Sequence, residues 1–259
     1  MLAHPTMNDT SANIVEIFSS IQGEGMLVGL RQIFLRFHGC TLECSYCDTR
    51  KTLSSRAPET CQVEKVPGRQ KFIPIKNPVS TIKILDLLNK WTSGFPNAHH
   101  SISLTGGEPL LQDKFLKNNL VELRKILPIY LETNGVLHAE LAHCIDFMDY
   151  ISMDFKLPST TKSRPYWDEH RKFLALAAQR QVYVKAVVSN DTSQSEIRQA
   201  SEIIYSVNRN IPLILQPLTS GERVESLSSE KLFQLQETAT KWLTEVRVIP
   251  QTHKYLHLL

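Results

Sequence analysis

Short apolar runs alternate with longer amphipathic stretches along most of this chain. The runs are rich in Val, Ile, Leu, Tyr and Phe, a composition that favours buried β-strands. The pattern predicts strands at 32–37, 101–106, 129–134, 150–155, 182–188, 212–218 and 245–250.

Between these runs, apolar residues recur with the period of an α-helix. Segment 79–91, for example, would place Ile82, Leu85, Leu88 and Trp91 on one face. Comparable patterns occupy 110–127, 167–180, 193–208 and 228–243. Alternating strands and helices imply right-handed crossovers and a parallel sheet. We therefore predict an α/β fold, a partial (open) TIM-like barrel of about six to seven mostly parallel strands, with function at the carboxyl ends of the strands. A doubly wound open sheet is the alternative.

Two segments show neither period. Residues 1–13 are expected to form a disordered lead-in, since they lack the basic and apolar regions of a signal peptide. Residues 14–259 would then form a single domain. Residues 50–80 are interpreted as a long loop or small insertion within it.

The composition narrows the possible partners. Hydrophobic residues make up 42% and charged residues 21% of the 259 residues, which is ordinary for a soluble globular protein. The net charge of +3 does not resemble a nucleic-acid arm or a polybasic membrane anchor. Because no apolar run approaches the ~20 residues that cross a bilayer, we expect a cytoplasmic protein without membrane contact.

Three of the five cysteines are clustered. Cys40, Cys44 and Cys47 follow the strand at 32–37 with the spacing C-x3-C-x2-C. A structural zinc site normally has four ligands, usually from two CxxC pairs, and no second pair is present. Three thiolates suit a 4Fe–4S cluster with one iron left unligated by protein. Cys61 and Cys144 stand apart, and we interpret them as small apolar fillers.

A second motif, LTGGEPLLQ at 104–112, lies at the end of the second predicted strand. Gly106 and Gly107 allow the backbone to approach a ligand closely. A glycine turn in which Pro109 opens a helix explains the same residues more simply. The cysteine motif followed by this GGEP motif resembles the radical S-adenosylmethionine (SAM) enzymes. The resemblance implies that the free iron chelates the amino and carboxylate groups of SAM, whose reductive cleavage yields a 5′-deoxyadenosyl radical.

Further motifs resemble one family within that class. They are IQGEG at 21–25, Arg36 in FLRF, CDT at 47–49 and QTHK at 251–254. Together they resemble the 7-carboxy-7-deazaguanine synthases of queuosine biosynthesis, from about residue 14 to the C-terminus. The resemblance implies a lyase that converts 6-carboxy-5,6,7,8-tetrahydropterin to 7-carboxy-7-deazaguanine with loss of ammonia. The radical would remove a hydrogen from C6, the ring would contract, SAM would be regenerated and Mg²⁺ would be required.

The same resemblance assigns site residues. The three clustered cysteines would hold the cluster, and Thr49 would bind Mg²⁺. SAM contacts would come from Tyr46, Cys47, Asp48, Gly106, Gly107, Glu108, Ser152, Asp154, Lys156, Gln216, Pro217, Leu218 and Thr219. Substrate contacts would come from Ile21, Gln22, Gly23, Arg36, Thr105, His253 and the terminal carboxylate of Leu259. Residues 132–134 would line the same mouth or form a plain turn. SMDFK at 152–156 is two residues longer than the SPK of many members.

Two alternatives remain at this point. A glycyl-radical activase shares the cysteine spacing, the GGEP-like turn and the MD-x-K pattern, but it explains neither IQGEG nor QTHK. A non-catalytic zinc-binding module would use the cysteines alone. For the synthase, the resemblance implies a small-molecule pterin substrate, a reductant such as flavodoxin or ferredoxin, and a homodimer.

Overall fold

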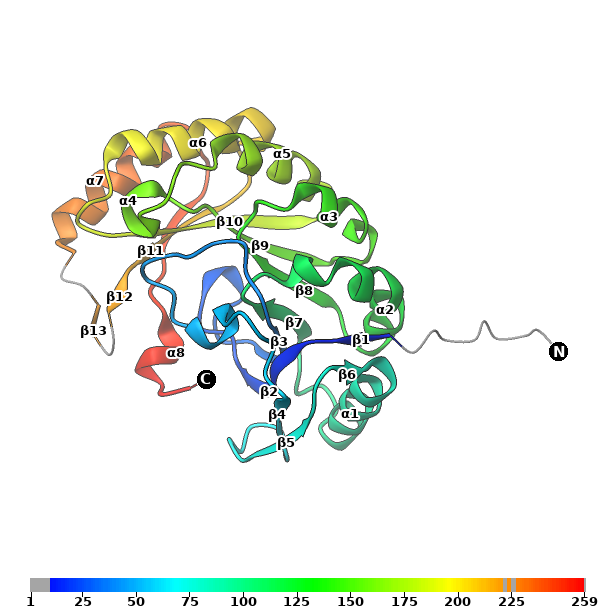
Figure 1. Ribbon diagram of the computed structural model, residues 1–259. Helices are drawn as coiled ribbons and strands as arrows, with labels where there is room; N and C mark the ends of the chain where they lie inside the picture. Colours follow the sequence, from blue (N-terminus) through cyan, green and yellow to red (C-terminus); the bar gives the residue numbers. More distant parts are fainter. Residues whose placement is uncertain (1–9, 221–222, 225–226, 259) are drawn as a thin grey trace.

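The computed structural model describes residues 10–220, 223–224 and 227–258. Its main feature is a ten-stranded sheet in the order β14-β11-β10-β9-β8-β7-β3-β2-β4-β5 (Figure 1). Seven neighbouring strands are parallel: β3 (Arg31–Phe37), β7 (Ser101–Gly106), β8 (Ile129–Thr133), β9 (Tyr150–Asp154), β10 (Gln181–Val188), β11 (Leu213–Pro217) and β14 (Val246–Val248). They match the seven predicted runs, and the sheet is not closed. The partial barrel prediction is confirmed.

Helices form an outer layer over the parallel strands (Figure 1). The long ones are α1 (Thr81–Gly94), α2 (Asp113–Ile126), α5 (Trp167–Ala177), α6 (Gln194–Asn208) and α7 (Ser229–Thr240), as the periodicity predicted. Serine side chains cap α1, α6 and α7, and α6 has a full capping box. The shorter helices are α3 (His138–Ala142), α4 (Pro158–Thr161) and α8 (Thr252–Tyr255), with 3₁₀ turns η1 (Gly25–Leu27), η2 (Arg50–Leu53), η3 (Pro109–Gln112) and η4 (Ile145–Phe147).

Three strands extend the sheet beyond the barrel. β2 (Ile14–Ile21) is antiparallel to β3, β4 (Thr60–Glu64) is parallel to β2, and β5 (Phe72–Lys76) is antiparallel to β4. Segment 50–80, for which no regular structure was predicted, therefore contains a β-hairpin that continues the main sheet. The two-stranded pair β12 (Thr219–Ser220) and β13 (Arg223–Val224) follows β11.

The predicted lead-in is too long at its C-terminal end. β1 (Ser11–Ala12) pairs with β6 (Val79–Ser80), and Ala12 is buried. The Thr10 carbonyl accepts a hydrogen bond from the backbone N–H of Thr81 at 2.9 Å. Residues 10–12 are thus held by the start of α1, whereas residues 1–9 lie outside the described part.

One end of the barrel is closed by the segment after β2. Met26 and Leu27 of η1 pack on Tyr130, Tyr183 and Ile214, which lie in the amino-terminal halves of their strands. This packing fills the interior at that end and leaves space at the carboxyl ends of the strands. No helix in the described residues is long and apolar enough to cross a membrane.

Candidate active site

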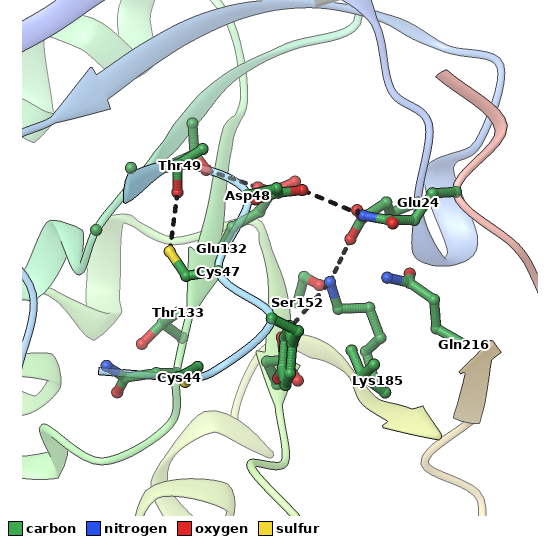
Figure 2. Close-up of a pocket in the computed structure, with 18 of the residues that line it drawn as sticks. Glu24, Cys44, Cys47, Asp48, Thr49, Glu132, Thr133, Ser152, Lys185 and Gln216 are labelled. Carbon is green, nitrogen blue, oxygen red and sulfur yellow. Dashed lines mark hydrogen bonds and ion pairs between the residues drawn. The ribbon is translucent and has the colours of Figure 1, made fainter. Parts of the chain in front are cut away.

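A cavity of about 210 Å³ lies at the carboxyl ends of the parallel strands (Figure 2). Strand ends, the loop after β3, the segment after β2 and the C-terminal tail all contribute to its wall. Nearly all the predicted site residues meet here: Ile21, Gln22, Gly23, Arg36, Cys40, Cys44, Tyr46, Cys47, Asp48, Thr49, Thr105, Gly106, Gly107, Ser152, Asp154, Lys156, Gln216, Leu218, Thr219 and His253. Glu108 and Pro217 are not among the lining residues. Leu259 lies outside the described residues.

The three clustered cysteines sit on a loop that is fixed at several points. Ser45 donates from its N–H to the Thr161 carbonyl at 3.2 Å and from its hydroxyl to the Thr160 carbonyl at 2.7 Å. Gly39 donates its N–H to the Thr52 carbonyl at 2.9 Å. All three thiols are free and partly exposed. Burial raises the pKa of the Cys40 and Cys44 thiols, so deprotonation at neutral pH requires an electrophile such as iron.

The three thiols do not converge on a single point in this structure. A tetrahedral zinc with Zn–S bonds of about 2.3 Å brings its sulfurs to about 3.8 Å from one another. Among the described residues, the cysteines do not form a group whose ligand atoms all lie within 4.8 Å of one another. A wider arrangement suits a multi-iron cluster, in which each cysteine binds a different iron.

The GGEP turn packs directly against the cysteine loop. The N–H of Glu108 donates to the Gly39 carbonyl at 2.7 Å. A Cβ on Gly107 would overlap the Gly39 carbonyl oxygen and lie 3.0 Å from the Cβ of Cys40. Gly107 is therefore required for the close packing of two backbone segments beside Cys40, the first of the three clustered cysteines.

The Glu108 carboxylate is hydrogen-bonded within the protein, and its role as a SAM contact stays a prediction. The side chain is fully buried and accepts hydrogen bonds from Leu110 N at 3.1 Å, Thr133 Oγ1 at 3.0 Å and Asn134 N at 2.8 Å. Burial outweighs these bonds and raises its pKa to about 7. In this structure the Glu108 carboxylate caps the Leu110 N–H at the start of η3 and also binds Thr133 and Asn134, so it ties the GGEP turn to the end of β8.

Three residues that line the cavity carry unpartnered acceptor atoms. Asp154 Oδ1, Gln216 Oε1 and Thr219 Oγ1 are buried and have no hydrogen-bond partner within the described residues. All three residues line the cavity. Buried polar atoms are normally paired, so these positions favour a ligand rich in donors. The ammonium, ribose hydroxyls and adenine amino group of SAM are such donors, and the site therefore fits SAM.

Another part of the cavity wall is a hydrogen-bonded set of polar side chains. Gln22 Nε2 donates to Glu132 Oε1 at 2.7 Å and Thr105 Oγ1 donates to Glu132 Oε2 at 2.7 Å. Gln22 is also held by Gln32 Oε1 at 2.9 Å. Arg36 lines the same wall and donates from Nε to Glu16 at 2.6 Å, with its guanidinium 5.4 Å from the Phe18 ring centre.

The C-terminal tail reaches the cavity through the QGEG segment. Thr252 donates its N–H to the Gly23 carbonyl at 2.9 Å. A Cβ on Gly23 would lie 2.5 Å from the Cβ of His253, so the tail can approach only where residue 23 has no side chain. Gln251 Nε2 donates to Glu24 at 2.6 Å. The two motifs, more than 200 residues apart in sequence, thus form one wall.

A buried ionic network completes the site. Lys185 contacts Glu24 directly and lies 3.6 Å from Asp154, which pairs with Lys156 at 2.7 Å. Burial would raise the pKa of Glu24, but Lys185 and Gln251 outweigh it and lower the pKa to about 2. Burial likewise opposes the charge of Lys185, yet Glu24 and Asp154 raise its pKa above the ordinary value. Both groups are therefore charged at neutral pH.

Some lining residues were not predicted from the sequence, namely Glu24, Lys185 and Gln251. Glu24 and Gln251 belong to the QGEG and QTHK motifs, where only their neighbours were assigned. Lys185 had its own signal, since it is the only charged residue in the run VYVKAVV. A lone charge in a buried strand points to a paired or functional position.

Comparison with known proteins places the chain in a family. Residues 34–190 match the radical SAM superfamily. Over 250 residues the chain is 49% identical to 7-carboxy-7-deazaguanine synthase of Geobacter sulfurreducens, covering 96% of this chain and 99% of the relative. It is 35% identical to the synthase of Archaeoglobus fulgidus, covering 95% and 98%. The crystal structure of QueE from Escherichia coli superposes with a TM-score of 0.62 at 22% identity, covering 94% and 95%.

The fold and the cysteine site define a radical SAM enzyme, which uses a 4Fe–4S cluster and SAM. Within that superfamily, the chain belongs to the 7-carboxy-7-deazaguanine synthase family, lyases of 7-deazapurine biosynthesis that act on a small molecule. Neither a zinc-binding module nor a glycyl-radical activase is supported by these matches.

Proposed function

We propose that the enzyme converts 6-carboxy-5,6,7,8-tetrahydropterin to 7-carboxy-7-deazaguanine with loss of ammonia. When bound, the cluster and SAM would supply the 5′-deoxyadenosyl radical that removes the hydrogen at C6. The observation that carries the proposal is the Gln22–Glu132–Thr105 set beside Arg36, which lines the same cavity as the three cysteines. This wall offers paired acceptors for a pyrimidine edge and a guanidinium for a carboxylate.

Glu132 is suited to the edge of a pterin. Each oxygen of its carboxylate accepts one hydrogen bond, from Gln22 or from Thr105, and retains a free lone pair. A pterin presents a ring N–H and an exocyclic amino group side by side, which matches two neighbouring acceptors. Gln22 and Thr105 would then fix the orientation of the Glu132 carboxylate, in addition to any contact of their own with the ligand.

Arg36 is suited to the carboxylate of the substrate. Its Nε is committed to Glu16, and its hydrogen bonds within the described residues do not use the two terminal nitrogens. The Phe18 ring and Glu16 fix the plane of the guanidinium. A planar guanidinium held in this way can bind a carboxylate through two parallel hydrogen bonds.

Mg²⁺ would bind at Thr49. The Thr49 hydroxyl lines the cavity and lies 3.8 Å from Cys47 Sγ, so an ion there would be next to the cluster loop. A hydroxyl is a hard donor of the type that Mg²⁺ prefers, and oxygens of the substrate would supply further ligands. The ion would neutralise charge on the substrate while the side chains orient the ring.

The tail would cap the substrate. The contacts of Thr252 and Gln251 with the QGEG segment support a role for His253 at the mouth of the cavity, and the carboxylate of Leu259 would lie further along the same tail.

We also propose a homodimer and a flavodoxin or ferredoxin as reductant, both from the family resemblance. Arg50 and Lys51 are exposed beside the cysteine loop and would suit an acidic electron carrier.

Turnover tests the proposal directly. Reconstituted, reduced protein is incubated anaerobically with SAM, Mg²⁺ and 6-carboxy-5,6,7,8-tetrahydropterin, and product and ammonia are quantified. The proposal predicts 7-carboxy-7-deazaguanine and ammonia in equal amounts. Reductive cleavage of SAM without any deazaguanine would overturn it.

The role of Glu132 has its own test. Glu132→Gln replaces one acceptor with a donor, so affinity for 6-carboxypterin, the oxidised analogue of the substrate, should fall about 10- to 100-fold. An analogue without the 2-amino group should be bound almost equally by both proteins. Glu237→Gln, an exposed position on α7, is the matched control. Equal losses for both analogues would refute edge recognition by Glu132.

A further inference from the structure

Lys185 occupies an unusual position in the barrel. It is the only charged residue of β10, and its neighbours Val184 and Ala186 are fully buried. Its side chain is 13% exposed and points into the cavity, where Figure 2 shows its ammonium between Glu24 and the end of β9. A lysine in such a place is tolerated only when opposite charges compensate it.

Two carboxylates provide that compensation, and they come from different parts of the chain. Glu24 belongs to the QGEG segment, which we propose binds the pterin, and Asp154 ends β9, where SAM contacts are expected. The Lys185 ammonium contacts Glu24 and lies 3.6 Å from Asp154. Lys185 therefore lies between the proposed pterin-binding segment and the strand end where SAM contacts are expected.

Glu24 in turn contacts the C-terminal tail and the start of its own segment. Its Oε1 accepts from Gln251 of the tail at 2.6 Å, and its backbone N–H donates to Gln22 Oε1 at 3.0 Å. A continuous chain of polar contacts therefore runs from Lys185 through Glu24 to the tail and to the proposed pterin contact. The orientation of the Glu24 carboxylate decides whether the contact with Gln251 forms, whereas the contact with Gln22 uses the Glu24 backbone.

We infer that Lys185 is a positioning residue that fixes Glu24 and, through Glu24, the C-terminal tail over the cavity. The inference rests on the proposed function only for the identity of the ligand under the tail. Without the ammonium, Glu24 would carry an uncompensated buried charge on the same side as Asp154. The carboxylate must then turn toward solvent or take up a proton, and either change weakens its bond to Gln251.

A charge-matched pair of variants tests this role. Lys185→Met removes the charge and keeps most of the side-chain volume. In the double variant Lys185→Met/Glu24→Gln, the amide oxygen at position 24 can still accept from Gln251 and no longer needs a cation. Lys172→Met is the control, because Lys172 is exposed on α5 and has no ion pair within the described residues. Circular dichroism confirms that each protein is folded before comparison.

Two readouts do not depend on turnover. The first is the affinity for 6-carboxypterin, measured by fluorescence titration without SAM or reductant. The second is the rate of chymotrypsin cleavage after Tyr255 in the tail, followed by mass spectrometry. Lys185→Met should weaken binding at least 10-fold and speed cleavage at least 5-fold. The double variant should recover most of both losses, and Lys172→Met should match the wild type.

The possible results distinguish the positioning role of Lys185 from the proposed function of the enzyme. Additive losses in the double variant, or unchanged cleavage in Lys185→Met, would overturn the positioning role. Failure of the wild type to bind the analogue or to form a deazaguanine would overturn the proposed function instead. The cleavage rates would still decide the role of Lys185, because they report on the tail whatever ligand lies beneath it.

Discussion

Gly107→Ala is the smallest change that should remove the cluster without unfolding the protein. The added methyl group would overlap the Gly39 carbonyl oxygen and lie 2.6 Å from the carbonyl carbon. Carbon atoms in contact normally lie about 3.5 Å apart, so the Gly39 backbone must retreat by about 1 Å. Cys40 is the next residue and must move with it.

The cluster site and the fold differ in how much backbone movement they tolerate, and this difference sets the expected loss of iron and the expected change in Tm. Metal–ligand distances are held within about 0.2 Å, so a movement of about 1 Å at Cys40 is incompatible with an intact three-cysteine site. The fold tolerates more, since overpacking costs about 1–3 kcal/mol and loss of the Glu108–Gly39 hydrogen bond costs about 1 kcal/mol. A total of about 2–4 kcal/mol lowers Tm by roughly 4–16 °C for a protein of this size.

The assay is iron and sulfide content after anaerobic reconstitution, together with Tm from circular dichroism. Gly94→Ala is the matched control, because a Cβ at the end of α1 meets nothing within 4 Å. We expect the Gly107 variant to retain less than half of the wild-type iron while the control retains all of it. Wild-type iron content in a folded Gly107→Ala protein would refute the packing argument.

Three further predictions concern other parts of the site. Cys44→Ser should abolish iron binding, whereas Cys61→Ala, in the β4–β5 hairpin, should leave the iron content unchanged. The lowered pKa of Glu24 stabilises the fold above its unfolded value of 4.5, and this contribution is lost as pH falls toward 2. Wild type should thus lose about 2 kcal/mol more than Glu24→Gln between pH 6 and 3 in urea unfolding. Deletion of residues 251–259 should raise KM for the pterin at least 10-fold and leave the cluster spectrum unchanged.

The parallel strands and long helices were predictable because each has a strong local period. SISLTG and YISMDF are short, apolar and followed by polar residues, so their ends could be recognised. The apolar face of α1 was predicted incorrectly. Thr81, Ile84, Leu88 and Trp91 are buried, whereas Ile82, which was assigned to the apolar face, is 47% exposed. The error follows from apolar residues on two sides of the helix, of which only packing selects one.

The sheet extension was not predictable in the same way. β2 (IVEIFSSI) mixes Glu and Ser into an apolar run, because its polar residues serve specific partners. Glu16 pairs with Arg36, and Ser19 bonds to His99 at 2.9 Å. β5 (FIPIK) contains a proline and lies at the edge of the sheet, where a missing N–H is tolerated. Such positions are defined by tertiary contacts that no local pattern contains.

Most motif residues that were assigned from the sequence line the cavity. Residues that contact other protein side chains, and not a ligand, were not predicted. Lys185 lies in no motif, and Gln251 lies in QTHK without an assigned role. Their contacts become visible only when the barrel brings β10 and the tail to Glu24. Glu108 is a different case, because its role as a SAM contact stays a prediction. It lies in a motif, but its carboxylate turns inward to cap η3 and bind the end of β8.

Isotope transfer from C6 of a carboxytetrahydropterin reports whether this cavity removes that hydrogen. Substrate deuterated at C6 is turned over by the reduced enzyme, and SAM, 5′-deoxyadenosine and product are analysed by mass spectrometry. The account predicts deazaguanine formation with deuterium in the adenosyl group of SAM, since the methyl group of 5′-deoxyadenosine has three equivalent hydrogens. Deazaguanine formed with no deuterium in either nucleoside would contradict it.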